Sequence, residues 1–147
     1  MVLDFSKIRK EDVLTAGGKG ANLGEMVSAG INVPKGFVVT ADAYKEFLKI
    51  NSLEEVFKKE LTGSVQDEAE LVKTAKKLRE LISKGMLPDT VINEIKNAYE
   101  KLEENVRVAV RSSATAEDLP DAIFAGQQET YLNVIGVEEV LLRIVDC

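Results

Sequence analysis

The sequence predicts an α+β fold in which antiparallel strands are covered by packed helices. Its 147 residues contain a charged stretch, 52–104, in which apolar side chains recur with helical spacing. Two alternating stretches rich in β-branched residues follow at 106–113 and 128–136. These two stretches are expected to pair antiparallel around the loop between them. The length suits one domain, and the last helical pattern ends without a stop signal, so we expect the chain to be part of a longer protein.

The first third of the chain predicts a helix, a strand and a second helix. A short segment, LDFSKI, precedes a glycine-rich turn, which leads into an amphipathic helix marked by apolar residues at 23–27. Gly30 stands where that helix is expected to stop. Residues 37–39 predict a strand, and Thr40 is placed to cap a helix over 41–50.

The rest of the chain predicts two surface helices, two strands and a final helix. The apolar stripes of 67–85 and 87–105 indicate that both helices pack on the body of the protein, with their charges in solvent. Alternation over the second strand places Leu132 and Val134 on one face. A last amphipathic stripe predicts a helix over 137–147.

The composition excludes several classes of function. The chain has no histidine, so neither a histidine acid–base catalyst nor a phosphohistidine lies within it. Its net charge of −6 argues against a nucleic-acid surface. No apolar run is long enough to cross a membrane, and the first residues lack the pattern of a signal peptide. We therefore expect a cytoplasmic protein with no membrane partner.

The stretch GGKGAN, residues 17–22, is the first candidate phosphate site. Glycines let backbone N–H groups approach a phosphate, a following helix offers its positive end, and Lys19 adds a charge. The stretch matches neither the Walker loop nor the dinucleotide-binding fingerprint. Two interpretations stay open: a phosphate-binding turn, and a tight turn before a helix with an exposed lysine.

Two further polar stretches flank the loop 113–127. In RSSATAED, Arg111 leaves a strand and can fork onto phosphate oxygens, or it can pair with the acids that follow. The three hydroxyls of this stretch either bind the same oxygens or close local turns. In FAGQQET, Gly126 permits close backbone approach, and its polar neighbours suit a polar ligand.

Together these stretches resemble a known family. GGKGANLGEM, VPKGFVVTADAYKEFL, VAVRSSATAEDLPDA and FAGQQETYLNV look like the N-terminal nucleotide-binding region of the phosphoenolpyruvate synthases, or pyruvate, water dikinases. Pyruvate phosphate dikinases are more distant members. The resemblance is densest at 14–48 and 106–135 and weak through the helices between them.

The resemblance implies that residues 1–147 are the first part of an ATP-grasp-like, ATP-binding domain. In the family, ATP used with Mg²⁺ phosphorylates a histidine on a separate domain. A third domain then passes the phosphate to pyruvate, giving phosphoenolpyruvate, AMP and phosphate. The histidine, the pyruvate site and the metal ligands are expected outside this chain, which would have little or no activity alone.

The resemblance also implies roles for individual residues. Lys19 of GGKG and Arg111 of VRSS would contact the ATP phosphates. Gly126 and Thr130 would belong to the loop and strand that cover the nucleotide. Gln127 and Gln128 are included only as their neighbours. No catalytic residue and no metal ligand is expected in this chain.

One departure and two alternatives accompany this hypothesis. Ile123 stands where family members usually have a serine, before FAGQQ. Rifampicin phosphotransferases share the RSSATAED and FAGQQET stretches but phosphorylate an antibiotic. A nucleotide-sensing module without catalysis is the other alternative.

The loop 113–127, whose residues are small and polar, is expected to be mobile.

Overall fold

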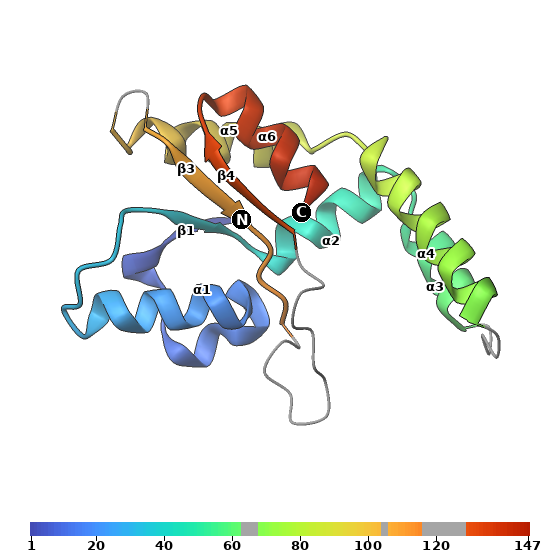
Figure 1. Ribbon diagram of the computed structural model, residues 1–147, viewed down its shortest axis with the longest axis horizontal. Helices are drawn as coiled ribbons and strands as arrows, with labels where there is room; N and C mark the ends of the chain where they lie inside the picture. Colours follow the sequence, from blue (N-terminus) through green and yellow to red (C-terminus); the bar gives the residue numbers. More distant parts are fainter. Residues whose placement is uncertain (63–67, 104–105, 116–128) are drawn as a thin grey trace.

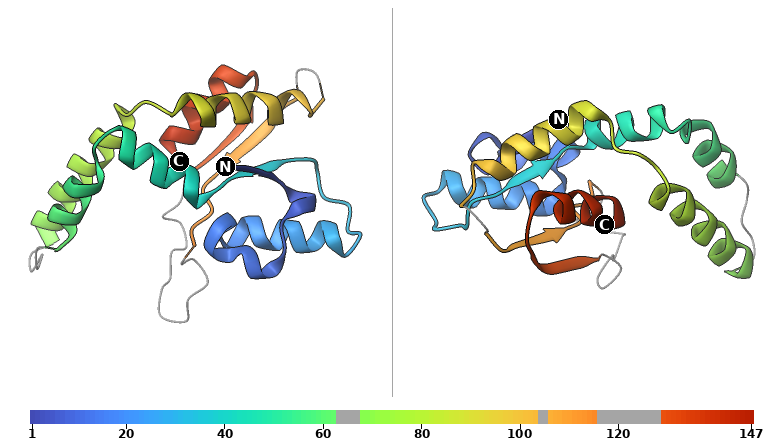
Figure 2. Two further views of the ribbon diagram at one scale, coloured as in Figure 1. Left: turned by 180° about the vertical axis from the view of Figure 1, so that it is seen from behind. Right: turned by 90° about the horizontal axis from the view of Figure 1, so that it is seen from above.

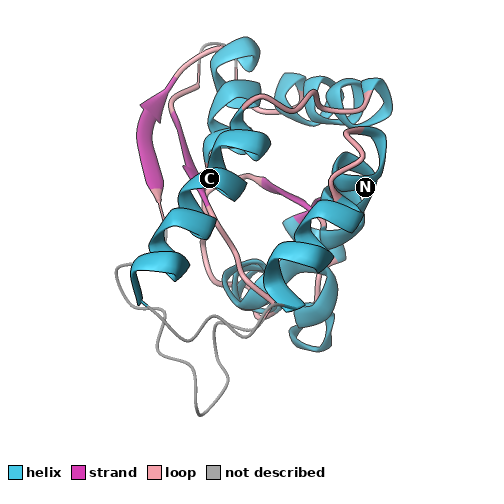
Figure 3. Ribbon diagram, turned by 90° about the vertical axis from the view of Figure 1, so that its right-hand side faces the viewer, coloured by secondary structure: helices cyan, strands magenta, loops and turns pink. Residues whose placement is uncertain are grey.

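The computed structural model describes residues 1–62, 68–103, 106–115 and 129–147, and it confirms an α+β chain. Helices form most of the described chain, and the strands are short (Figure 3). The elements in order are β1 (Val2–Asp4), the 3-10 turns η1 (Phe5–Lys7) and η2 (Lys10–Asp12), α1 (Val13–Ser28), β2 (Phe37–Val39), α2 (Ala41–Ile50), α3 (Glu54–Thr62), α4 (Glu68–Ser83), α5 (Asp89–Glu100), β3 (Val108–Arg111), β4 (Thr130–Val134) and α6 (Val137–Asp146). No helix within the described ranges is both long and apolar enough to cross a lipid bilayer.

The first strand pair supports α1. β1 and β2 are antiparallel, with Leu3 opposite Val38. Val38 also joins Ile8 and Ala16 in a small buried cluster between β2 and α1. The predicted strand over 37–39 is therefore confirmed. Its partner β1 overlaps the start of the segment LDFSKI, for which the sequence indicated no strand.

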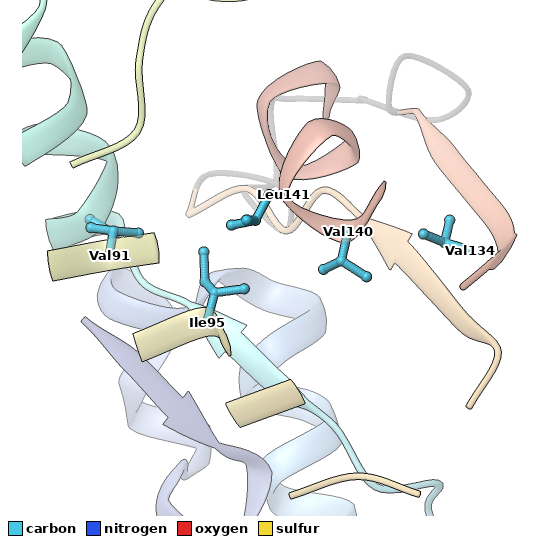
Figure 4. Packing of buried hydrophobic residues seen from close by; sticks show 6 residues of the cluster. Val91, Ile95, Val134, Val140 and Leu141 are labelled. Atoms are coloured by element: carbon cyan, nitrogen blue, oxygen red, sulfur yellow. The ribbon is translucent and has the colours of Figure 1, made fainter. Parts of the chain in front are cut away.

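The second strand pair lies beside α5 and α6 (Figure 1). Val91 and Ile95 of α5 are fully buried, and they face Val140 and Leu141 of α6 and Val134 at the end of β4 (Figure 4). These side chains form the larger core of the described chain. The helical stripe and the strand pairing predicted for the C-terminal third are thus confirmed.

The predicted faces of β4 are wrong at its end. Val108 of β3 is opposite Val134, and Val110 is opposite Tyr131, so β4 carries an extra residue between these pairs. Asn133 takes the positive φ of 57° at this bulge. Val134 consequently turns to the core with Tyr131, whereas Leu132 is 69% exposed.

The expectation that α4 packs along its whole stripe is also wrong. Leu78 is buried, but Leu71 and Val72, one and a half to two turns earlier, are 53% and 63% exposed. α3 and α4 project together from the rest of the protein, as Figure 2 shows, and Glu60 and Lys77 join them by an ion pair of 2.7 Å. The apolar periodicity predicted the helix correctly and its environment only in part.

Candidate functional site

The glycine-rich stretch lies inside a helix. α1 begins at Val13, before the glycines, and is interrupted only at Gly17, which has φ 72° and ψ 167°. The predicted turn before a helix is therefore a break within one. α1 ends as expected near Gly30: the amide of Gly30 donates to Val27 and that of Ile31 to Met26, the pattern of a glycine-terminated helix.

The glycines of α1 allow other parts of the chain to approach its backbone. Gly17, Gly20 and Gly24 follow one another at helical spacing. A Cβ atom at Gly17 would overlap the carbonyl oxygen and hydroxyl of Ser113. One at Gly20 would lie 3.0 Å from a methyl of Val38, and one at Gly24 would lie 2.6 Å from a carbonyl oxygen. Close packing is thus one physical reason for these glycines.

Ser113 and Ala114 hold this part of α1. The Ser113 hydroxyl donates to the carbonyl of Ala16 at 2.9 Å and accepts from the amide of Gly20 at 3.0 Å. The amide of Gly18 donates to the carbonyl of Ala114, also at 3.0 Å. The segment that follows β3 is therefore fixed to the break in α1, and Figure 1 shows it running from the strand toward the helix.

This contact joins the segments that carry three of the predicted site residues. Arg111 and Thr130 are directly opposite each other on β3 and β4, and both are exposed. Lys19 lies between Gly18 and Gly20, whose amides donate to Ala114 and Ser113, three and two residues after Arg111. Lys19 is partly buried, which differs from the exposed lysine of the alternative interpretation.

The remaining predicted site residues cannot be placed. Gly126, Gln127 and Gln128 lie outside the described residues, as does Ile123. The loop predicted to be mobile is described only at 113–115, where it carries the contacts to α1.

Ser112, next to Ser113, and Cys147, beside the residue that precedes β4, are poor candidates for catalysis. The hydroxyl oxygen of Ser112 is buried and makes no hydrogen bond to the described part of the chain. The thiol of Cys147 lies 3.9 Å from the carbonyl of Glu129, and its desolvation, with nearby carboxylates, raises its pKa. A raised pKa keeps the thiol protonated and weakly nucleophilic. Among the described residues, no group of three or more His, Cys, Asp or Glu side chains could hold a metal ion.

Ser113 is the residue whose role the sequence analysis missed. A serine after a strand ordinarily closes a turn or caps a helix, and nothing in its spacing indicates a partner 93 residues earlier in the chain. The glycines at helical spacing carried a usable signal, because a glycine-lined helix face admits another segment closely.

A comparison with protein families identifies the region. Residues 13–147 match the family described as "Pyruvate phosphate dikinase, AMP/ATP-binding domain". The chain belongs to this family. The match includes Lys19, Arg111 and Thr130, whose segments the hydrogen bonds of Ser113 and Ala114 and the strand pairing connect.

Similar proteins align with almost the whole length of this chain. A protein named phosphoenolpyruvate synthase from Aquifex aeolicus is 48% identical over 157 positions, and another of that name from Deinococcus radiodurans is 46% identical over 149. A probable phosphoenolpyruvate synthase from Methanocaldococcus jannaschii is 49% identical over 149. These alignments include 97% to 100% of this chain but only 12% to 19% of the relatives' lengths.

Proposed function

We propose that this chain provides part of the nucleotide site of a phosphoenolpyruvate synthase. The reaction converts ATP, pyruvate and water into phosphoenolpyruvate, AMP and phosphate through a phosphohistidine. The family match and the names of relatives that are nearly half identical to the chain support this activity. Because the 147 residues contain no histidine, the phosphorylated histidine would lie outside them, on the family's separate phosphohistidine domain.

The observation that carries the proposal is the junction between α1 and the segment after β3. It joins the backbone around Lys19 to the strand end that bears Arg111. A guanidinium can fork onto two phosphate oxygens, and an ammonium adds a compact charge beside them. Two cations held at one junction suit the triphosphate of ATP.

The other predicted residues complete the proposed site. Thr130, opposite Arg111, and Gly126 would form the cover over the nucleotide, with Gln127 and Gln128 beside them. In this proposal, residues 1–147 would be the first part of an ATP-grasp-like domain. The ligands of the Mg²⁺ that accompanies ATP would come from other parts of the protein. The protein would act in the cytoplasm.

The test is product formation by the natural full-length protein with ATP, Mg²⁺ and pyruvate. The proposal predicts equal amounts of phosphoenolpyruvate and AMP. Lys19→Ala or Arg111→Ala should lower kcat/KM for ATP by about 10- to 100-fold, because each removes a charged hydrogen bond worth about 1.5–3 kcal/mol.

Exposed cations elsewhere in the chain provide matched controls. Lys84 follows α4 and Arg107 precedes β3, so Lys84→Ala and Arg107→Ala should leave kcat/KM unchanged. ATP consumption that requires rifampicin rather than pyruvate would contradict the proposed acceptor. Activity unaffected by Lys19→Ala and Arg111→Ala would contradict the proposed site.

A further inference from the structure

A serine hydroxyl is inserted into one turn of α1. In an uninterrupted helix, the amide of Gly20 would donate to the carbonyl of Ala16, four residues earlier. Here the Ser113 hydroxyl lies between these two groups, accepting from Gly20 at 3.0 Å and donating to Ala16 at 2.9 Å. Insertion of a side chain into the helical hydrogen-bond ladder is a recognised cause of helix kinks. The break at Gly17 coincides with this insertion.

The next contact completes the hold on this turn. The amide of Gly18 donates to the carbonyl of Ala114 at 3.0 Å, whereas in a regular helix it would donate to residue 14. The amides on either side of Lys19 are thus both bound to the segment after β3. The backbone that carries Lys19 is therefore set by that segment rather than by α1 alone.

Gly17 leaves the space that this insertion requires. A Cβ at this position would overlap the Ser113 carbonyl oxygen and hydroxyl, and its φ of 72° is one that other residues rarely adopt. The Ser113 hydroxyl thus occupies the space that a side chain at position 17 would need.

From these contacts we infer that Ser113 is a positioning residue for the nucleotide and acts through Lys19. This inference rests on the proposed function, since it assumes that Lys19 contacts the phosphates. Removing the hydroxyl by Ser113→Ala frees the carbonyl of Ala16 and the amide of Gly20 to bond directly to each other. α1 then closes across its kink, and Lys19 leaves the orientation in which it meets the phosphates.

Arg111 provides the contrast that makes the inference testable. It is held on β3 by its pairing with Thr130 on β4, which does not depend on the Ser113 hydroxyl. Ser113→Ala should therefore displace Lys19 and leave Arg111 in place. A general loss of folding would weaken the contributions of both cations equally.

The experiment is a double-mutant cycle on ATP affinity, measured by calorimetry in the natural full-length protein with Mg²⁺ present. Ser113→Ala should raise the Kd for ATP about 3- to 30-fold and no more than Lys19→Ala does, because a displaced Lys19 loses only part of its attraction to the phosphates. In the Lys19→Ala background the same change should alter Kd less than about twofold. In the Arg111→Ala background its full effect should remain.

The outcomes separate this inference from the proposed function. If Lys19→Ala does not change Kd, the proposed function itself fails at this residue. If Lys19→Ala weakens binding but Ser113→Ala does not, only the role of Ser113 is overturned. The inference is equally overturned if Ser113→Ala raises Kd by the same factor in all three backgrounds, since that result indicates a general structural effect.

Two further variants serve as a control and as a replacement for Ser113→Ala. Ser83 bonds its hydroxyl to the carbonyl of Glu80 on the exposed side of α4, so Ser83→Ala is a matched control and should leave Kd unchanged. Should Ser113→Ala fail to fold, the cycle is repeated with Ser113→Cys, which keeps a side chain in place but donates and accepts hydrogen bonds weakly. The same dependence on Lys19 is expected.

Discussion

Gly17→Ala should destabilise the protein more than an ordinary substitution at a glycine of positive φ. At Gly17 the new methyl group would overlap three atoms of Ser113. Its φ and ψ of 72° and 167° lie in a region that is essentially restricted to glycine. The substitution therefore imposes backbone strain and also displaces the segment that holds α1.

The magnitude follows from these two effects. Occupying this backbone region costs an alanine about 1–3 kcal/mol. Displacing Ser113 and Ala114 also breaks three hydrogen bonds to α1, of which we count about 2 kcal/mol as lost net stability. The expected loss in the free energy of unfolding is about 3–5 kcal/mol.

Gly30→Ala isolates the backbone effect. Gly30 also has a positive φ, 76°, but no atom lies within 4 Å of the position its Cβ would occupy. This variant should lose only about 1–2 kcal/mol. Urea unfolding of the chain, followed by circular dichroism, measures both losses. A loss at Gly17→Ala no larger than that at Gly30→Ala would refute the contact with Ser113.

Three further predictions concern the core and the strand ends. Tyr99→Phe should lower the free energy of unfolding by about 1–2 kcal/mol, because the Tyr99 hydroxyl donates to a backbone carbonyl at 3.1 Å and accepts from a backbone amide at 2.9 Å. Tyr44→Phe, on a half-exposed ring, is the control and should change it by almost nothing. Ile95→Ala should lower the free energy of unfolding by about 2–5 kcal/mol, because this side chain is fully buried. Leu71→Ala, at 53% exposure, should change it by no more than about 0.5 kcal/mol. Equal losses would contradict the packing of the larger core. A hydrogen bond from the Ser6 hydroxyl is the main cause that lowers the pKa of Asp4. The contribution of this carboxylate to stability should therefore be complete above the unfolded-state pKa and be lost as the pH falls through the folded-state pKa. An NMR titration that finds the Asp4 carboxyl at or above its ordinary pKa would contradict the hydrogen bond.

The elements that the sequence predicted well are those with strong local signals. The periodicity of 87–105 predicts α5, and its buried Val91 and Ile95 follow directly from that pattern. Likewise, Gly30 ends α1 because a residue of positive φ is needed there. Local spacing suffices in both cases, because the feature that forms depends only on neighbouring residues.

The errors arise where the decisive contact is distant in sequence. The face of Val134 depends on a bulge in its pairing with β3, which alternation along one strand cannot reveal. The break in α1 depends on Ser113, and the glycines alone suit a loop equally well. Thr40 begins α2 as predicted, but its hydroxyl donates to the carbonyl of Met1 rather than capping the helix.

The candidate site shows the same division. The residue types of GGKG and VRSS suit a phosphate ligand, but their chemistry alone also allows a tight turn at GGKG and an ion pair at Arg111. Only the fold shows that Lys19 and Arg111 lie on segments fixed to each other, because their connection passes through hydrogen bonds between residues far apart in the chain.

The most direct test of the nucleotide site is a calorimetric titration of the natural full-length protein with ATP and Mg²⁺. Lys19→Ala and Arg111→Ala are compared with the controls Lys84→Ala and Arg107→Ala. We predict that each of the first two substitutions raises the Kd for ATP about 10-fold or more, and that neither control changes it by more than about twofold. Binding of ATP that is equally tight in all four variants would contradict the claim that these two cations hold the nucleotide phosphates.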